Sequence, residues 1–154
     1  MRLYCCKTGV KSSWENNRLI ENPNGESRGG AIFITGKSGF TISNALFLFN
    51  HVEMDGGGIY LFDCKDVALK NSVFLLNKAK WGGAIYLENC SRVSLFNNLF
   101  VGNRVARDGG AISLSYCSDI RLHHNRYLVN HAIRSGKNID LHHSMNVYYE
   151  DLTD

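Results

Sequence analysis

The sequence predicts an all-β fold, a right-handed parallel β-helix with three short strands in each coil. Three observations carry this prediction: a glycine-rich phrase recurs at a fixed period, aromatic residues recur at the same period, and no repeat leaves room for a helix. A repeat of this length is typical of a solenoid in which each repeat forms one coil. The isoleucines after the glycines show steps of 27, 26, 27 and 27 residues: Ile32, Ile59, Ile85, Ile112 and Ile139.

Each repeat contains three stretches of strand-like alternation separated by turn residues. In the clearest repeat these are the glycine phrase Gly82–Leu87, a stretch around Val93 and Leu95, and Phe100–Asn103. Equivalent strands of stacked coils pair in parallel about 4.8 Å apart, so like side chains form columns. Two asparagine columns are expected to form hydrogen-bonded ladders at strand corners: Asn44, Asn71 and Asn97, and Asn50, Asn77, Asn103 and Asn130.

The length of 154 residues is that of one domain, which is expected to have two parts. Residues 1–28 are mostly polar and only faintly periodic, and they are expected to form an N-terminal cap or an irregular, incomplete coil. Residues 29–154 are expected to form the repeat domain, with about five coils of 26–27 residues and a degraded C-terminal coil that serves as a cap.

The composition argues against several classes of partner. The net charge of +3 is too small to indicate nucleic-acid binding, so no nucleic acid is expected. The longest apolar run, around Ala45–Phe49, is too short to span a bilayer, so no membrane insertion by this segment is expected. Met1–Lys7 contains no apolar region long enough for a secretory signal.

The cysteines and histidines do not indicate a metal site or a cofactor, and neither is predicted. The five cysteines include no CxxC pair, and the six histidines lack the spacing or the cysteine partners of a typical zinc site. Cys64, Cys90 and Cys117 keep the repeat register and are expected to form a column of buried, reduced thiols. Their spacing alone would also allow one disulfide, although three in a column cannot all pair.

The glycine phrase and the aromatic phrase together resemble a known family. Gly-Gly-Ala-Ile stands at Gly29–Ile32, Gly82–Ile85 and Gly109–Ile112, with a variant at Gly56–Ile59, and Phe-x-x-Asn follows at Phe47–Asn50, Phe74–Asn77 and Phe100–Asn103. This pair of motifs is similar to the repeats of the polymorphic outer-membrane proteins, the passenger domains of a class of bacterial autotransporter adhesins, over about residues 29 to 141. The resemblance implies adhesion by an extracellular or cell-surface protein, of which this chain would be a fragment or mature form.

Three basic residues form a predicted ligand-binding column. Lys80, Arg107 and Arg134 each lie two residues before a glycine phrase, so they are in register on successive coils, and Lys78 and Arg104 lie nearby. Charges about 4.8 Å apart along a ridge suit an extended polyanion such as an acidic glycan. The alternative interpretation is an ordinary solvated loop edge.

Three aromatic residues form a second predicted binding column. Phe33, Tyr60 and Tyr86 occupy the outward position of the first strand on successive coils. Exposed aromatic rings could stack on sugar rings or bury against a partner. The alternative interpretation is stacking among the rings themselves, which would stabilise the sheet.

The third strand of each repeat is apolar on both faces, which predicts a partner interface. If Phe47 and Phe49 point inward, the outward stripe is an apolar face larger than a soluble monomer normally exposes. This face is expected to be covered by the N-terminal residues, by missing parts of a longer chain or by a second protein, in an oligomer or a larger assembly. The interface residues expected from this pattern are Leu48, Leu75, Val101 and Leu128.

No catalytic residues are predicted, and the preferred function is a non-catalytic scaffold, an adhesin-like surface module for a glycan or protein partner. One alternative is a carbohydrate-active enzyme, a polysaccharide hydrolase or lyase on a reduced β-helix. Its paired carboxylates would be Asp55 and Asp108, two coils and about 9–10 Å apart, with Trp81 on the coil between them. Another alternative is a structural subunit that docks through its apolar face.

Overall fold

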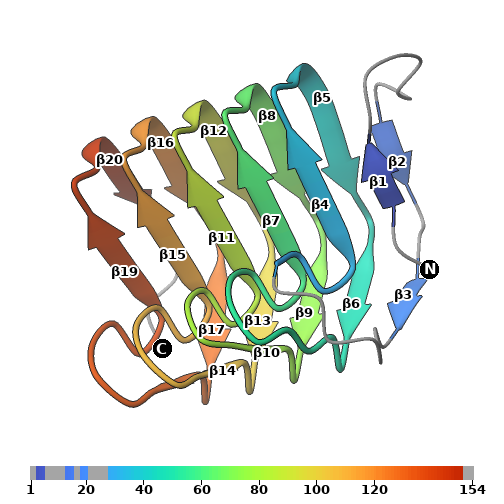
Figure 1. Ribbon diagram of the computed structural model, residues 1–154. Coiled ribbons are helices and arrows are strands. Elements are labelled where there is room, and N and C mark those ends of the chain that lie inside the picture. The colour runs from blue at the N-terminus through green and yellow to red at the C-terminus, as the bar shows by residue number, and fades with distance from the viewer. Residues whose placement is uncertain (1–2, 6–12, 16–17, 21–27, 151–154) are drawn as a thin grey trace.

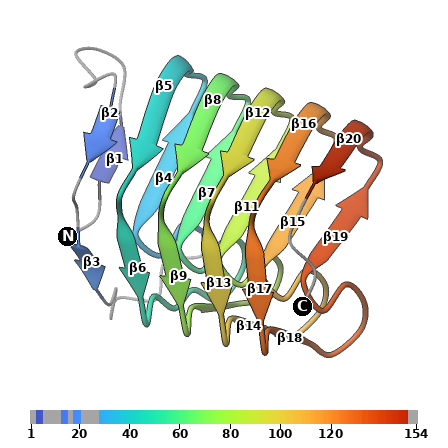
Figure 2. The same cartoon turned by 180° about the vertical axis from the view of Figure 1, so that it is seen from behind.

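The structure, a computed structural model, describes residues 3–5, 13–15, 18–20 and 28–150. Within these ranges the chain forms strands and turns and no helix, and it winds as a solenoid whose equivalent strands lie side by side (Figures 1 and 2). Every strand pair in the described part of the chain is parallel, as predicted. No helix long and apolar enough to cross a membrane occurs among these residues.

Equivalent strands of successive coils pair into three long sheets and one short sheet. The first sheet consists of β1 (Leu3–Cys5), β4 (Ile32–Thr35), β7 (Ile59–Phe62), β11 (Ile85–Glu88), β15 (Ile112–Ser115) and β19 (Ile139–His142). The second consists of β2 (Ser13–Glu15), β5 (Ser38–Ser43), β8 (Lys65–Lys70), β12 (Ser91–Phe96), β16 (Ser118–His123) and β20 (Met145–Glu150). The third consists of β3 (Arg18–Ile20), β6 (Leu46–Leu48), β9 (Val73–Leu75), β13 (Leu99–Val101) and β17 (Arg126–Leu128). The fourth, short sheet consists of β10 (Lys78–Ala79), β14 (Arg104–Val105) and β18 (His131–Ala132).

The register of the first sheet confirms the repeat period. Ile85 pairs with Ile59 on one side and with Ile112 on the other. The single 26-residue step is taken up in the turn before the glycine phrase, where the backbone N–H groups of Lys80 and Trp81 both donate to the carbonyl oxygen of Met54, at 2.8 and 3.2 Å. Strands β1, β2 and β3 pair with β4, β5 and β6, so the long sheets continue into residues 3–5, 13–15 and 18–20.

The fourth sheet adds to the three strands per coil that the sequence predicts. Each of its strands has only two residues, of which the second points inward, so Ala79 and Val105 are buried. Two residues are too few for the alternation that identifies a strand in a sequence. The fourth sheet matters here because its outward residues, Lys78 and Arg104, are basic and exposed.

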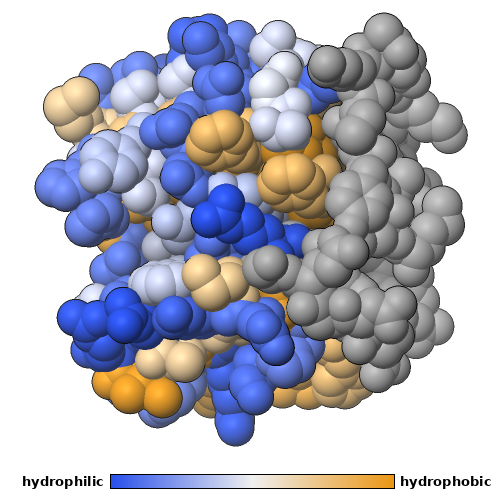
Figure 3. All heavy atoms as spheres, in the orientation of Figure 1, coloured by the Kyte–Doolittle hydropathy of each residue, from blue (hydrophilic) through white to orange (hydrophobic). Residues whose placement is uncertain are grey.

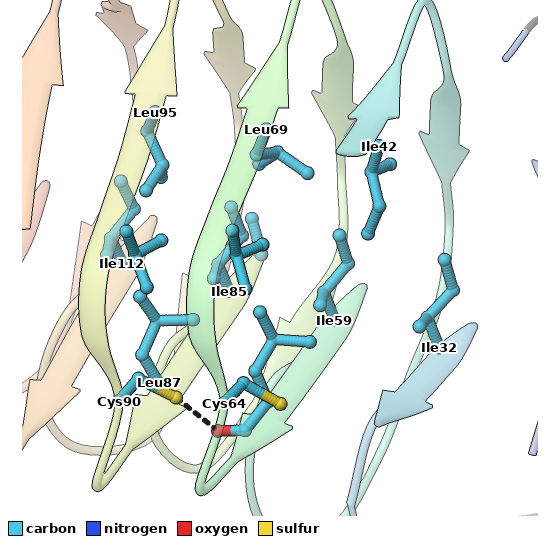
Figure 4. Close-up of a cluster of buried hydrophobic side chains, with 14 of the residues drawn as sticks. Ile32, Ile42, Ile59, Cys64, Leu69, Ile85, Leu87, Cys90, Leu95 and Ile112 are labelled. Carbon is cyan, nitrogen blue, oxygen red and sulfur yellow. Dashed lines mark hydrogen bonds between the residues drawn. The ribbon is translucent and has the colours of Figure 1, made fainter. Parts of the chain in front are cut away.

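Columns of inward apolar side chains fill the coils. Ile59, Ile85 and Ile112 of the first sheet are buried, and Leu69 and Leu95 of the second sheet are buried within the same core cluster (Figure 4). Burial of one such side chain contributes roughly 1.5–3 kcal/mol. Because each coil repeats the same inward residues, the core is continuous along the solenoid axis.

The predicted ladder of Asn50, Asn77, Asn103 and Asn130 is buried and complete. The Nδ2 of each of the first three donates to the Oδ1 of the next asparagine at 2.9–3.0 Å, and that Oδ1 also accepts the backbone N–H of the asparagine before it. The other predicted column lies on an exposed corner, where Asn97 Nδ2 donates to Asn71 Oδ1 at 3.0 Å. The buried ladder at that corner falls one residue later and was not predicted: Ser72, Asn98 and Asn125.

The second glycine of each glycine phrase lies where successive coils approach most closely. A Cβ at these positions would come within 1.9–2.3 Å of a carbonyl oxygen on the next coil. No side chain fits at such a distance, because the obstructing atom belongs to the backbone. The glycines in this column are Gly30, Gly57, Gly83 and Gly110.

The cysteine column is buried and its thiols are free, as predicted. Cys90 Sγ donates to Leu61 O at 3.5 Å (Figure 4). Cys117 Sγ likewise donates to Leu87 O at 3.4 Å. The interaction with the Cys117 side chain on the next coil makes the largest contribution to raising the pKa of the Cys90 thiol, to about 12. These thiols therefore act as small core residues with weak donors.

Candidate binding surfaces

The predicted basic column lies in the turn between the fourth sheet and the first. Backbone hydrogen bonds hold it in register, because Arg107 N donates to Lys80 O and Arg134 N donates to Arg107 O, both at 3.0 Å. Arg107 and Arg134 are exposed, and Lys80 is half-buried. The three residues therefore follow one another on successive coils.

A second basic column runs beside the first, on the outward side of the fourth sheet. Arg104 pairs with Lys78 and with His131, and all three residues are exposed. His51, which lies one coil before Lys78, forms an isolated bridge to it. The two columns together are called the basic strip: Lys78, Lys80, Arg104, Arg107, His131 and Arg134.

Trp81 lies within the basic strip and contacts two of its cations. The centroid of its ring is 4.6 Å from Lys80 Nζ and 5.1 Å from Arg107 Cζ. Each cation–π contact contributes about 0.5–1 kcal/mol at such a partly exposed site. In the sequence, Trp81 was noted only because its coil lies between those of Asp55 and Asp108. Its position next to Lys80 and one coil from Arg107 could have indicated that it contacts both cations.

The predicted aromatic column is present, and its rings stack on one another. Ring centroids are 5.2 Å apart for Phe33 and Tyr60 and 5.5 Å apart for Tyr60 and Tyr86. Tyr60 is only 1% exposed, whereas Phe33 and Tyr86 are half-buried. A ligand would therefore meet Phe33 and Tyr86 rather than the ring faces of Tyr60.

Charged residues surround Tyr60 on the outer side of the first sheet. Its hydroxyl donates to Glu88 Oε2 at 2.5 Å, and the Arg28 guanidinium lies 5.3 Å from its ring centroid. Burial, and then the hydrogen bond to Glu88, raise the pKa of Tyr60 far above its usual value. The hydroxyl therefore remains a neutral donor that ties the β7 coil to the β11 coil.

Asp55 and Asp108, the carboxylates considered for catalysis, each contact a neighbouring coil, Asp55 the preceding one and Asp108 the following one. Asp55 Oδ2 lies 3.0 Å from Arg28 Nε, and burial raises the pKa of Asp55 despite this cation. Asp108 Oδ1 accepts hydrogen bonds from Ser135 N at 3.0 Å and from Ser135 Oγ at 2.8 Å. Both carboxylates thus hold the turns that precede the glycine phrases.

The predicted partner face lies on the outer side of the third sheet. Its residues pair across the sheet in one column and are half-buried: Leu48, Leu75, Val101 and Leu128. Phe47 points into the core, whereas Phe49 is 52% exposed, so the two residues do not share the inward side. Phe49 adopts a φ of 55° in the turn after β6, and this turn directs it outward.

The late histidines make separate contacts. His123 Nδ1 lies 3.1 Å from Glu150 Oε2, and His143 stacks on Tyr116 with ring centroids 5.0 Å apart. In the described part of the chain, no group of three or more His, Cys, Asp or Glu side chains could hold a metal ion.

Comparison with known proteins supports the architecture. The model of a family described as "Right handed beta helix region" matches residues 3–127. Comparisons with curated proteins and with solved structures gave no match. The matched segment contains the aromatic column and the basic strip as far as Arg107.

Proposed function

The chain belongs to the right-handed β-helix family, and we propose that it is a non-catalytic scaffold that binds an acidic glycan along the basic strip. In this proposal the coils supply rigidity and spacing, and the exposed cations supply recognition. The protein would serve as an adhesin-like module at the cell surface or outside the cell. Its Gly-Gly-Ala-Ile and Phe-x-x-Asn repeats, which resemble those of polymorphic outer-membrane proteins, support this location.

The observation that carries the proposal is the register of two adjacent basic columns on the same coils. Arg104 lies one coil from Lys78, and Arg107 lies one coil from Lys80, so the cations recur about every 4.8 Å. A polymer that bears carboxylate or sulfate groups can meet several such cations at once. Multiple weak contacts along one chain then add up to useful affinity.

Trp81 supports the proposal because it restrains two of the cations before a ligand arrives. Lys and Arg side chains lose considerable rotamer entropy when they are fixed. The contacts of Lys80 and Arg107 with the indole ring remove part of that loss in advance. The half-buried ring itself also offers apolar surface beside the cations.

The test is binding to a sulfated or uronate-containing polysaccharide, measured by calorimetry at several salt concentrations. We expect the variant Lys80→Ala, Arg107→Ala, Arg134→Ala to bind about 3- to 150-fold more weakly, because it loses three exposed ion pairs that each contribute about 0.2–1 kcal/mol. Its affinity should also depend less on salt. The matched control removes three exposed basic residues from the second sheet: Lys65→Ala, Lys70→Ala and Arg121→Ala.

Equal loss of binding in both triple variants would show non-specific charge attraction and contradict the proposal. Cleavage of the polysaccharide that disappears in Asp55→Asn or Asp108→Asn would also contradict it, in favour of a carbohydrate-active enzyme. The control variant should unfold at the same urea concentration as the wild type, because Lys65, Lys70 and Arg121 are exposed. The strip variant loses two cation–π contacts with Trp81 and should remain folded, with a cost of about 1–2 kcal/mol in the free energy of unfolding.

A further inference from the structure

One corner of the solenoid carries large apolar residues in a backbone conformation that does not favour them. Phe49, Leu76 and Val129 follow directly after β6, β9 and β17, at the ends of strands that lie side by side in Figure 2. They have φ values of 55°, 55° and 49° and are 52%, 42% and 82% exposed. These three residues are called the apolar corner.

The left-handed conformation favours glycine, asparagine and aspartate, and a bulky or β-branched residue there is an outlier. The other corners mostly follow this rule, and their left-handed positions include Asn44, Asp63, Asn71, Asn89 and Asn97. At the apolar corner the chain accepts both backbone strain and exposed apolar surface. The Leu76 side chain packs closely over Gly102 on the next coil, because a Cβ added to Gly102 would lie only 2.8 Å from Leu76 Cδ2. Strain of this kind is commonly found at functional positions.

The surfaces on either side of the apolar corner differ in character. On one side lies the aliphatic outer face of the third sheet, with Leu75 and Leu128 next to the corner residues. On the other side lies the fourth sheet, where Lys78 and Arg104 are exposed. Figure 3 shows hydrophobic and strongly hydrophilic side chains close together along the lower edge of the molecule. The edge therefore combines protruding apolar groups with a cationic flank, and Glu53 is the exposed acidic residue nearest to it in sequence.

This combination fits one kind of occupant. A second copy of the chain would bring like-charged flanks together, which opposes association. A peptide that binds in a groove needs a concave surface, whereas Val129 protrudes from an edge. A lipid surface with anionic headgroups accepts protruding apolar side chains at the acyl boundary and attracts flanking Lys and Arg residues.

We propose that the apolar corner docks the protein on an anionic lipid surface. Phe49, Leu76 and Val129 enter the interfacial layer, and Lys78 and Arg104 contact the lipid phosphates. The corner extends over three coil steps, roughly 14 Å along the solenoid. The contact is shallow, and no segment crosses the bilayer. Lys78 and Arg104 also belong to the basic strip, but this inference does not depend on glycan binding, because the apolar residues that carry it lie outside the strip.

The test is co-sedimentation of the full chain with vesicles of phosphatidylcholine mixed with phosphatidylglycerol, compared with pure phosphatidylcholine vesicles. We expect binding to the mixed vesicles only. The variant Phe49→Asn, Leu76→Asn, Val129→Asn should bind them more than about tenfold more weakly. It should also unfold at the same or a higher urea concentration, because asparagine suits the left-handed conformation. Soluble glycerol phosphate should not compete if the apolar contact is required.

The matched control is Tyr116→Asn, which changes a bulky, 57% exposed residue with a φ of 52° at a different corner. This variant should keep wild-type vesicle binding. The proposal would be overturned if the triple variant bound vesicles as tightly as the wild type, or if it lost much of its stability. The apolar corner would then have only a packing role. Equal binding to neutral vesicles would also overturn it. Self-association that disappears in the triple variant, without vesicle binding, would assign the corner to a second copy instead.

Discussion

Two stacks of aromatic rings run along the solenoid, one inside it and one outside. The inner stack belongs to the third sheet, has centroid distances of 4.5, 4.9 and 5.2 Å, and consists of Phe47, Phe74, Phe100 and Tyr127. The outer stack lies on the first sheet, has distances of 5.2 and 5.5 Å, and consists of Phe33, Tyr60 and Tyr86. The outer stack ends where Ser113 takes the aromatic position.

The difference shows which part of the repeat the fold controls. An inner residue must fill a fixed volume between coils, so a change of size leaves a cavity or a clash. An outer residue meets only its neighbours and the solvent, so its identity can drift from coil to coil. Departures from the pattern expected on the outside therefore indicate function more clearly than the common repeat does, as with the apolar corner.

The largest effect is expected from Phe74→Ala in the inner stack. Phe74 is fully buried between Phe47 and Phe100, so truncation should cost about 3–5 kcal/mol in the free energy of unfolding. Urea unfolding followed by circular dichroism measures this. Phe74→Leu keeps most of the volume and should cost less than half as much. If Phe74→Ala costs no more than Phe33→Ala, the distinction between the two stacks fails.

The next largest effect is expected from Asn77→Ala in the buried ladder. Asn77 Nδ2 donates to Phe47 O at 3.0 Å and to Asn103 Oδ1 at 3.0 Å, and its Oδ1 accepts two hydrogen bonds from Asn50. Loss of the amide leaves several buried polar groups unpaired, at about 1–3 kcal/mol each. We expect about 3 kcal/mol by urea unfolding. Asn97→Gly removes a similar hydrogen bond on an exposed corner and suits the left-handed φ of 54° there, so it serves as the control and should cost less than about 1 kcal/mol.

A smaller effect is expected from Tyr60→Phe in the outer stack. This change keeps the ring stack and removes only the hydrogen bond to Glu88, so it should cost about 1 kcal/mol in the free energy of unfolding. Thermal unfolding of Tyr60→Phe and Glu88→Gln, alone and together, measures the coupling between the two residues. Fully additive costs would mean that the hydroxyl and the carboxylate do not stabilise one another.

The smallest effect is expected from Asp55→Asn, and it should appear as a change in pH dependence. Burial raises the pKa of Asp55 above 3.8, so the folded protein holds this proton more tightly than the unfolded chain does. Wild-type stability should therefore fall as the pH rises from 3.8 through the folded pKa, and Asp55→Asn should lack this decrease. Urea unfolding of both proteins from about pH 3 to pH 7 tests this. A difference between them that grows toward acid pH would contradict the sign.

The fold could be predicted because the inner columns leave a regular trace in the sequence. The isoleucines of the first sheet and the asparagine ladder that begins at Asn50 recur at the coil period, and the structure stacks both. The fourth sheet could not be predicted, because two-residue strands such as Lys78–Ala79 show no alternation. The outward direction of Phe49 was also missed, because its left-handed turn is set by the coil rather than by the residue itself.

The candidate sites were less predictable, because they depend on contacts between side chains that lie outside the strict repeat. The register of Lys80 and Arg107 followed from the period, but the position of Trp81 between them did not. The burial of Tyr60 likewise depends on Arg28 and Glu88, which come from different coils. Alternation along a strand identifies outward residues but not what covers them.

The close approach at the glycine column limits how such a protein can change in length. Each of these glycines faces the backbone of the next coil, so the coils fit together only in their present alignment. An insertion of a few residues within a strand would shift every later glycine away from its partner. A duplication of about 27 residues would preserve every alignment, so the molecule can lengthen or shorten only by whole coils, except for the single residues that a turn can absorb, as the turn at Lys80 does.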